Sequence, residues 1–137
     1  MGTVIRPEVS KKNEFYIDRH RYYELKHYCL QYRSWEKDLQ TINLYPRQAL
    51  DRIAYHPESI DPVLKLVEAR MYYTHRINQL KVIAEEIDPV IGPCVLEGVT
   101  TNTSYEKLRA WIDIPCCKDY YYTVYRKFFW LLDRYRK

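Results

Sequence analysis

Apolar residues recur at helical spacing in a first long stretch of the chain. From Asn13, which can serve as an N-cap, to about residue 39, one stripe is apolar while most charged residues lie elsewhere around the helix. The stripe consists of Phe15, Tyr22, Leu25, Cys29, Tyr32 and Leu39. This spacing predicts a long amphipathic helix with a break near Ser34.

A second long helix is predicted to start at Asp61-Pro62. The carboxylate can cap the helix, and proline fits the first helical position, where no intrahelical N–H bond is needed. The apolar positions then follow a heptad-like pattern: Leu66, Tyr73, Ile77, Leu80, Ala84 and Ile87. We expect this helix to pack antiparallel on the first one, with a homodimer seam as the alternative.

Shorter helices are predicted around the second long one. Residues 40–61 lose the apolar periodicity, although a short helix over Pro46–Tyr55 fits the proline at its first turn. Asp88-Pro89 repeats the start signal of the long helix. The helix that follows is predicted to be interrupted or bent near Gly92-Pro93 and to end at Gly98.

The last part of the chain has the pattern of a helix, a short turn and a long helix. Ser104 can cap a helix of about nine residues, which Pro115 ends because proline disfavours helix at the residue before it. Cys116 or Cys117 then opens a helix that runs to near the C-terminus. Residues 103–137 therefore predict a helix-turn-helix unit, with a helical hairpin and a solvated basic end as the alternative.

One side of the final helix is apolar and the other carries cations. In a helix-turn-helix protein the first residues of the second helix meet base edges, while cations farther along contact phosphates. With both groups included, the predicted DNA-binding set is Lys118, Asp119, Tyr121, Tyr122, Thr123, Arg126, Lys127 and Arg134.

Two parts of the sequence carry a resemblance to a known group. Residues 15–26, FYIDRHRYYELK, are similar to the opening of small proteins encoded in phages and prophages of Gram-positive bacteria. The runs TSYEKL, IPCCK and YTVYRKFFWLL, between residues 103 and 132, resemble their C-terminal part. That part resembles the helix-turn-helix of sigma-factor region four and of late-gene regulators of the RinA and ArpU type. The resemblance implies a phage transcriptional regulator that binds double-stranded DNA.

Tyrosine is unusually frequent, with 15 residues against 3 phenylalanines and 3 tryptophans. Tyrosine combines an apolar ring with a polar tip, so many of these residues can simply lie half-buried in helices. Exposed tyrosine, tryptophan and arginine are also the side chains that anchor protein interfaces. The alternative function is therefore a phage inhibitor of a host protein, such as a polymerase or a defence nuclease, in the manner of an anti-defence or anti-CRISPR protein. Its predicted protein-binding residues are Tyr22, Tyr23, Tyr73 and Trp130.

Length and composition bound the fold. The chain has 137 residues, 47% hydrophobic and 29% charged, with a net charge of +4, which is typical of one globular domain. We expect an all-α fold, namely a small bundle of two long helices plus the helix-turn-helix unit. It forms a single domain over residues 13–137 after a flexible basic tail, residues 1–12.

The sequence gives no support to catalysis, a cofactor, a metal or a membrane. No nucleophile elbow, P-loop or paired-carboxylate signature is present, so we do not expect an enzyme. The cysteines and histidines lack metal-ligand spacing. Because no apolar run reaches the roughly 18 residues of a membrane span and no secretory signal is visible, we expect a protein of the bacterial host cytoplasm.

Overall fold

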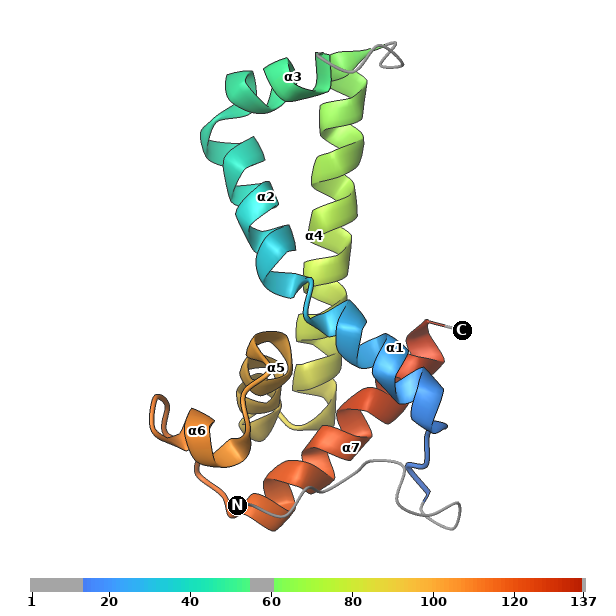
Figure 1. Cartoon of the computed structure of the whole chain (residues 1–137), viewed down its shortest axis with the longest axis vertical. Coiled ribbons are helices and arrows are strands. Elements are labelled where there is room, and N and C mark those ends of the chain that lie inside the picture. The colour runs from blue at the N-terminus through green and yellow to red at the C-terminus, as the bar shows by residue number, and fades with distance from the viewer. Residues whose placement is uncertain (1–13, 55–60, 137) are drawn as a thin grey trace. The chain divides into compact units, whose positions relative to one another are not determined.

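The regular structure of the described residues, 14–54 and 61–136, is entirely helical, as the spacing of the apolar positions predicts. In these residues the computed structural model contains seven α-helices and no strand, which confirms the all-α fold class (Figure 1). The helices are α1 (Arg19–Cys29), α2 (Tyr32–Leu44), α3 (Pro46–Ala54), α4 (Pro62–Ile87), α5 (Ile91–Thr101), α6 (Tyr105–Arg109) and α7 (Lys118–Tyr135). The predicted basic tail and the N-cap at Asn13 lie outside the described residues.

The first predicted long helix is two helices, and the predicted position of its break was wrong. α1 begins at Arg19, where the Asp18 carboxylate accepts a hydrogen bond from the backbone N–H of His20 at 3.1 Å. It ends at Cys29, because the N–H groups of Leu30 and Gln31 turn back to carbonyls of the last turn. Ser34 lies inside α2.

Helix starts that depend on local chemistry were predicted correctly. Asp61 Oδ1 accepts from the N–H groups of Val63 and Leu64 at 3.1 and 3.2 Å, and α4 begins at Pro62. α3 begins at Pro46, the proline that the sequence places in its first turn.

The predicted interruption and end of the fifth helix were wrong. α5 continues through Gly92-Pro93 because the proline lies in its first turn, where a backbone N–H has no intrahelical partner. The helix also passes Gly98 and ends at Thr101. The C-cap is Asn102, which has a φ of 55° and the left-handed conformation that asparagine tolerates better than most residues.

Asp88 joins the start of α5 to α7 through three hydrogen bonds. The Tyr120 hydroxyl donates to Asp88 Oδ2 at 2.6 Å, and the N–H groups of Val90 and Ile91 donate to Oδ1 at 2.9 Å. The hydrogen bond from Tyr120, together with the two backbone bonds, holds the pKa of Asp88 below its usual value.

Because this pKa is lowered by folding, its contribution to stability is present above the ordinary aspartate pKa and is lost as pH falls through the folded value. We expect Asp88→Asn, which keeps an N-cap acceptor but does not titrate, to reduce the loss of stability on acidification below about pH 4. Urea denaturation at a series of pH values measures this, and Tyr120→Phe should reduce the loss in the same direction. Identical pH dependence of Asp88→Asn and the wild type would contradict the assignment.

The described residues form two compact units. The first unit combines residues 14–31 with 80–136, and the second unit contains 32–54 and 61–79. α4 therefore contributes residues 62–79 to the second unit and 80–87 to the first. The prediction of a single domain over 13–137 stays a prediction.

In the second unit, α2 runs antiparallel to the first part of α4 and α3 connects their ends (Figure 1). One hydrophobic cluster of this unit consists of Ile42, Ala49 and Leu66, with Leu50, Ala69 and Tyr73 packed against them. The antiparallel arrangement predicted for the first long helix is thus seen for the α2 part of it. The predicted α4 stripe is buried at Leu66, Ile77, Leu80 and Ala84 and half-buried at Tyr73 and Ile87.

The core of the first unit lies along the inner face of α7. This helix packs mainly on α5 and also on α1. Its apolar positions recur every three or four residues, so one face is buried along most of its length. The buried residues of that face are Tyr121, Val124, Phe128, Phe129 and Leu132.

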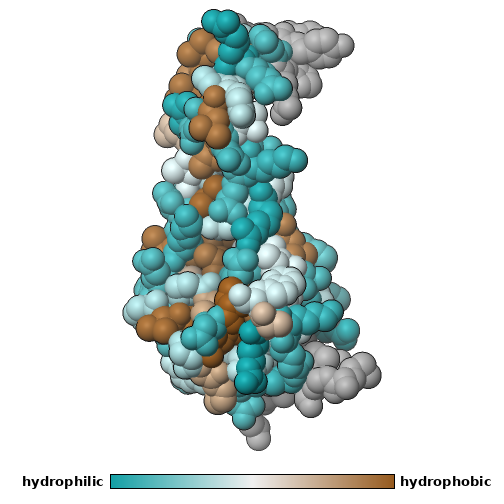
Figure 2. All heavy atoms as spheres, turned by 90° about the vertical axis from the view of Figure 1, so that its left-hand side faces the viewer, coloured by the Kyte–Doolittle hydropathy of each residue, from teal (hydrophilic) through white to brown (hydrophobic). Residues whose placement is uncertain are grey.

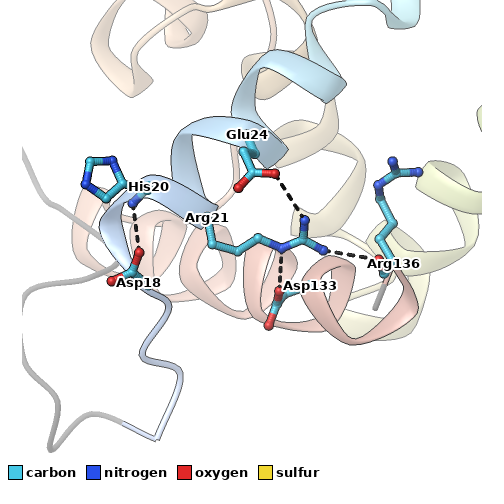
Figure 3. Close-up of polar contacts among 6 residues, drawn as sticks. All are labelled: Asp18, His20, Arg21, Glu24, Asp133 and Arg136. Atoms are coloured by element: carbon cyan, nitrogen blue, oxygen red, sulfur yellow. Dashed lines mark hydrogen bonds and ion pairs between the residues drawn. The ribbon is translucent and has the colours of Figure 1, made fainter.

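Arg21 ties α1 to the last turn of α7 (Figure 3). Its Nε donates to Asp133 Oδ1 at 2.7 Å, and one terminal nitrogen donates to the backbone carbonyl of Arg136 at 3.2 Å. The other terminal nitrogen lies 3.6 Å from a carboxylate oxygen of Glu24. A bond between the hydroxyls of Tyr22 and Tyr125, 2.7 Å long, joins the same two helices. These contacts fix which side of α7 remains exposed.

Candidate nucleic-acid interface

α6, a short connection and α7 occupy the segment for which the sequence predicts a helix-turn-helix unit. Ser104 Oγ accepts from the N–H of Lys107 at 3.4 Å, which confirms the predicted cap. The regular part of α6 is shorter than predicted, but a bond from the N–H of Ile112 to the carbonyl of Leu108 continues the helical turn to Ile112. Residues 113–117 then connect to α7, which opens after Cys117 as predicted.

The connection is held by the preceding helix. The Tyr105 hydroxyl donates to the backbone carbonyl of Cys116 at 2.7 Å, and the N–H of Cys116 donates to the carbonyl of Ile114. Ile114 is buried. The turn is therefore anchored on both sides, which fixes the direction in which α7 leaves it.

The predicted DNA-binding residues at the start of α7, which were expected to meet base edges, have different surroundings. Tyr121 is only 1% exposed, because it shares the buried face of α7 with Val124 and Phe128, and it cannot contact a duplex from there. Tyr122 is half-buried, and its hydroxyl accepts from the N–H of Tyr105 at 3.3 Å. Asp119 is exposed, and Lys118 is engaged by a carboxylate.

Lys118 forms an exposed ion pair with Glu106 of α6. Its Nζ donates to Glu106 Oε1 at 2.6 Å. The hydrogen bond from Lys118 lowers the pKa of Glu106, and the same bond raises the pKa of Lys118. The pair joins α6 to the start of α7 and occupies the ammonium group of a residue predicted to contact base edges.

The remaining predicted DNA-binding residues lie together on the side of α7 opposite the core. We call this side the outer face, and it comprises Thr123, Arg126, Lys127, Trp130 and Arg134. Arg134 is exposed and the other four are partly exposed. The Thr123 hydroxyl donates to the backbone carbonyl of Asp119 at 2.9 Å, one turn earlier in the helix.

Aromatic rings support the cations of the outer face. Lys127 Nζ lies 5.4 Å from the centroid of the Phe15 ring, and that ring meets Trp130 edge to face at 5.4 Å between centroids. The Arg134 guanidinium carbon lies 4.2 Å from the centroid of the Trp130 ring. The rings hold the two cations over an apolar surface. Lys127 also attracts the Asp88 carboxylate and contributes to lowering its pKa.

No carboxylate of the described residues lies within ion-pair distance of Arg126, Lys127 or Arg134. The acidic residue near the end of α7, Asp133, is instead bound to Arg21 on the side toward α1. The outer face therefore carries three positive charges along two turns of helix.

Three of the predicted protein-binding residues belong to the first unit, and Tyr73 belongs to the second. Tyr22 is buried in the core of the first unit, whereas Tyr23 beside it is 41% exposed. Tyr73 is half-buried in the second unit, where burial and the Asp38 carboxylate raise its pKa. Trp130 belongs to the outer face.

Two functional contacts were missed by the sequence interpretation. Phe15 was placed on the stripe of the first helix, but it precedes α1 and packs on Trp130. Arg21 had no assigned role, although it holds both Asp133 and the end of α7. Their partners are more than a hundred residues away, so no local spacing indicates them.

Within residues 14–54 and 61–136, no group of three or more histidine, cysteine or acidic side chains is arranged to hold a metal ion. None of the described helices is both long enough and apolar enough to cross a membrane. No protein-family model, curated protein or solved structure matches the chain.

Proposed function

We propose that this chain is a phage-type transcriptional regulator that binds duplex DNA through the outer face of α7. The observation that carries the proposal is the set of three cations, Arg126, Lys127 and Arg134, with no ion-pair partner among the described residues. They lie on α7, which follows α6 and a short connection, and the proposal takes these two helices as a helix-turn-helix unit. The resemblance of residues 103–132 to phage regulators supports the same function.

The contacts of this face divide into two kinds. Lys127 and Arg134 are seven residues apart, so they point to the same side of the helix and lie about 10 Å apart along its axis. Such cations bind phosphates irrespective of sequence. In this proposal Asp119 and Thr123, nearer the start of α7 on the same side, meet base edges, where a carboxylate accepts from the amino group of cytosine.

We expect the affinity for a DNA duplex to fall as salt is added. For three phosphate contacts, a plot of log affinity against log salt concentration should have a slope of about −2.7, because each contact contributes about −0.9. Fluorescence anisotropy with a labelled duplex, repeated over a series of salt concentrations, measures this slope. Absence of binding, or binding that does not weaken with salt, would contradict the proposal.

The alternative function, inhibition of a host protein, stays a prediction. One feature of α4 favours it. Part of α4 exposes an apolar stripe at helical spacing, in which Val63, Val67 and Met71 are 60%, 43% and 66% exposed. Figure 2 shows that hydrophobic residues also interrupt a mostly hydrophilic face of the molecule. Exposed apolar side chains of this kind are used in protein interfaces. Failure of the DNA titration would favour this function.

A further inference from the structure

The first unit contains a cavity away from the outer face. It has a volume of about 430 Å³ and lies among α1, the end of α5, α6 and the start of α7. This size falls in the range of pockets that bind small molecules, roughly 300–1,000 Å³. Four tyrosines from α1 and α7 line it: Tyr22, Tyr121, Tyr122 and Tyr125.

One of these tyrosines has a hydroxyl without a partner. Tyr121 is 1% exposed, and its hydroxyl oxygen is buried with no hydrogen bond to any described residue. The neighbouring tyrosine hydroxyls all form hydrogen bonds. Those of Tyr22 and Tyr125 bond to each other, and that of Tyr122 accepts from a backbone N–H. A buried polar group is normally hydrogen-bonded, and this hydroxyl can still donate or accept a hydrogen bond.

Gly98 makes the space in which this hydroxyl lies. A Cβ at position 98 would come within 2.2 Å of the Tyr121 hydroxyl oxygen. Gly98 also lines the cavity. The absence of a side chain at this position thus leaves room for the hydroxyl beside the cavity lining.

The rim of the cavity is cationic. Lys26 of α1, Lys107 of α6 and Lys118 of α7 line it, against a single carboxylate, Glu106. Glu106 pairs with Lys118, and no carboxylate of the described chain lies within ion-pair distance of Lys26 or Lys107. The lining has a net charge of +2, which complements the charge of about −1.5 to −2 that a phosphate monoester carries at neutral pH.

We propose that this cavity binds a free nucleoside monophosphate. Lys26 and Lys107 bind the phosphate, the tyrosine rings pack against the base, and the Tyr121 hydroxyl hydrogen-bonds to the ligand. Rings and cations together select this ligand class, because a phosphate alone leaves the aromatic wall empty and a nucleoside alone leaves the lysines unpaired. The proposal stands apart from DNA binding, since it uses the inner side of α7.

Isothermal titration calorimetry of the full chain with a panel of nucleoside 5′-monophosphates, the matching nucleosides and inorganic phosphate tests this site. We expect a monophosphate to bind more tightly than its nucleoside and than phosphate. Tyr121→Phe, which removes only the unpartnered hydroxyl, should weaken that binding about tenfold, the effect of one lost hydrogen bond. Tyr120→Phe, the neighbouring tyrosine that bonds to Asp88 outside the cavity, should leave it unchanged.

Lys26→Gln provides a second variant that does not touch the core, and it should weaken monophosphate binding while leaving any nucleoside binding unchanged. The thermal midpoint of each variant, measured without ligand, checks that it is folded. The proposal is overturned if no monophosphate binds, if phosphate or a nucleoside binds as tightly, or if neither Tyr121→Phe nor Lys26→Gln alters the affinity. These outcomes leave DNA binding by the outer face unaffected, so the two proposals fail separately.

Discussion

Replacing Phe129 by alanine should lower the free energy of unfolding by about 3–5 kcal/mol. The side chain is fully buried, at 0% exposure. Its ring lies 5.1 Å from Tyr22 and 5.0 Å from Tyr125, measured between centroids, and thus joins α7 to α1. The variant loses both the transfer free energy of the ring and the contacts of the residues around the cavity that it leaves.

Urea denaturation followed by circular dichroism measures this loss. Trp111→Ala is the matched control, because it removes an even larger aromatic side chain that is 67% exposed. Its effect should stay within about 0.5 kcal/mol, as is usual for surface substitutions. A Phe129→Ala variant as stable as this control would show that α7 does not pack on α1 as described.

Gly92→Ala should destabilise the chain by about 3 kcal/mol, at the upper end of the usual cost of overpacking. A Cβ at this position would lie 1.8 Å from the backbone carbonyl oxygen of Ala84 and 2.6 Å from its carbonyl carbon. Both atoms belong to the backbone of α4, so no side-chain rotation relieves the clash. α5 would have to move away from the end of α4.

The sign of this effect distinguishes packing from local preference. Alanine favours a helix over glycine by about 1 kcal/mol, so propensity alone predicts that Gly92→Ala stabilises the protein. Thermal and urea denaturation measure the difference, with Glu85→Ala at an exposed position of α4 as the control. A stabilised Gly92→Ala variant would refute the close approach of the two helices.

Local chemistry explains why some elements could be predicted from the sequence. Asp61 and Ser104 bond to N–H groups two or three residues away, so the cap and the helix start are encoded in one short segment. Gly98 shows the limit of such rules. Glycine is common at helix ends, yet Gly98 lies inside α5. Because it has no side chain, the Tyr121 hydroxyl of α7 fits beside it.

Only part of the candidate site could be predicted from the sequence. Helical periodicity identified the exposed side of α7, with Arg126, Lys127 and Arg134 on it. Periodicity does not reveal distant partners, such as Phe15 against Trp130 or Glu106 against Lys118. These contacts arise from tertiary packing. The contact between Glu106 and Lys118 also shows which predicted cation is engaged in an ion pair.

Charge reversal on the outer face tests DNA binding most directly. The triple variant Arg126→Glu, Lys127→Glu and Arg134→Glu is compared with Lys65→Glu, Arg70→Glu and Lys81→Glu, three exposed cations of α4, so that both proteins undergo the same change in net charge. Duplex affinity is measured against salt for both. We expect the control to retain the wild-type slope and the outer-face variant to lose about 1 from the slope for each contact removed, with binding greatly weakened. Equal affinities and equal slopes for the two variants would contradict the assignment of DNA binding to α7.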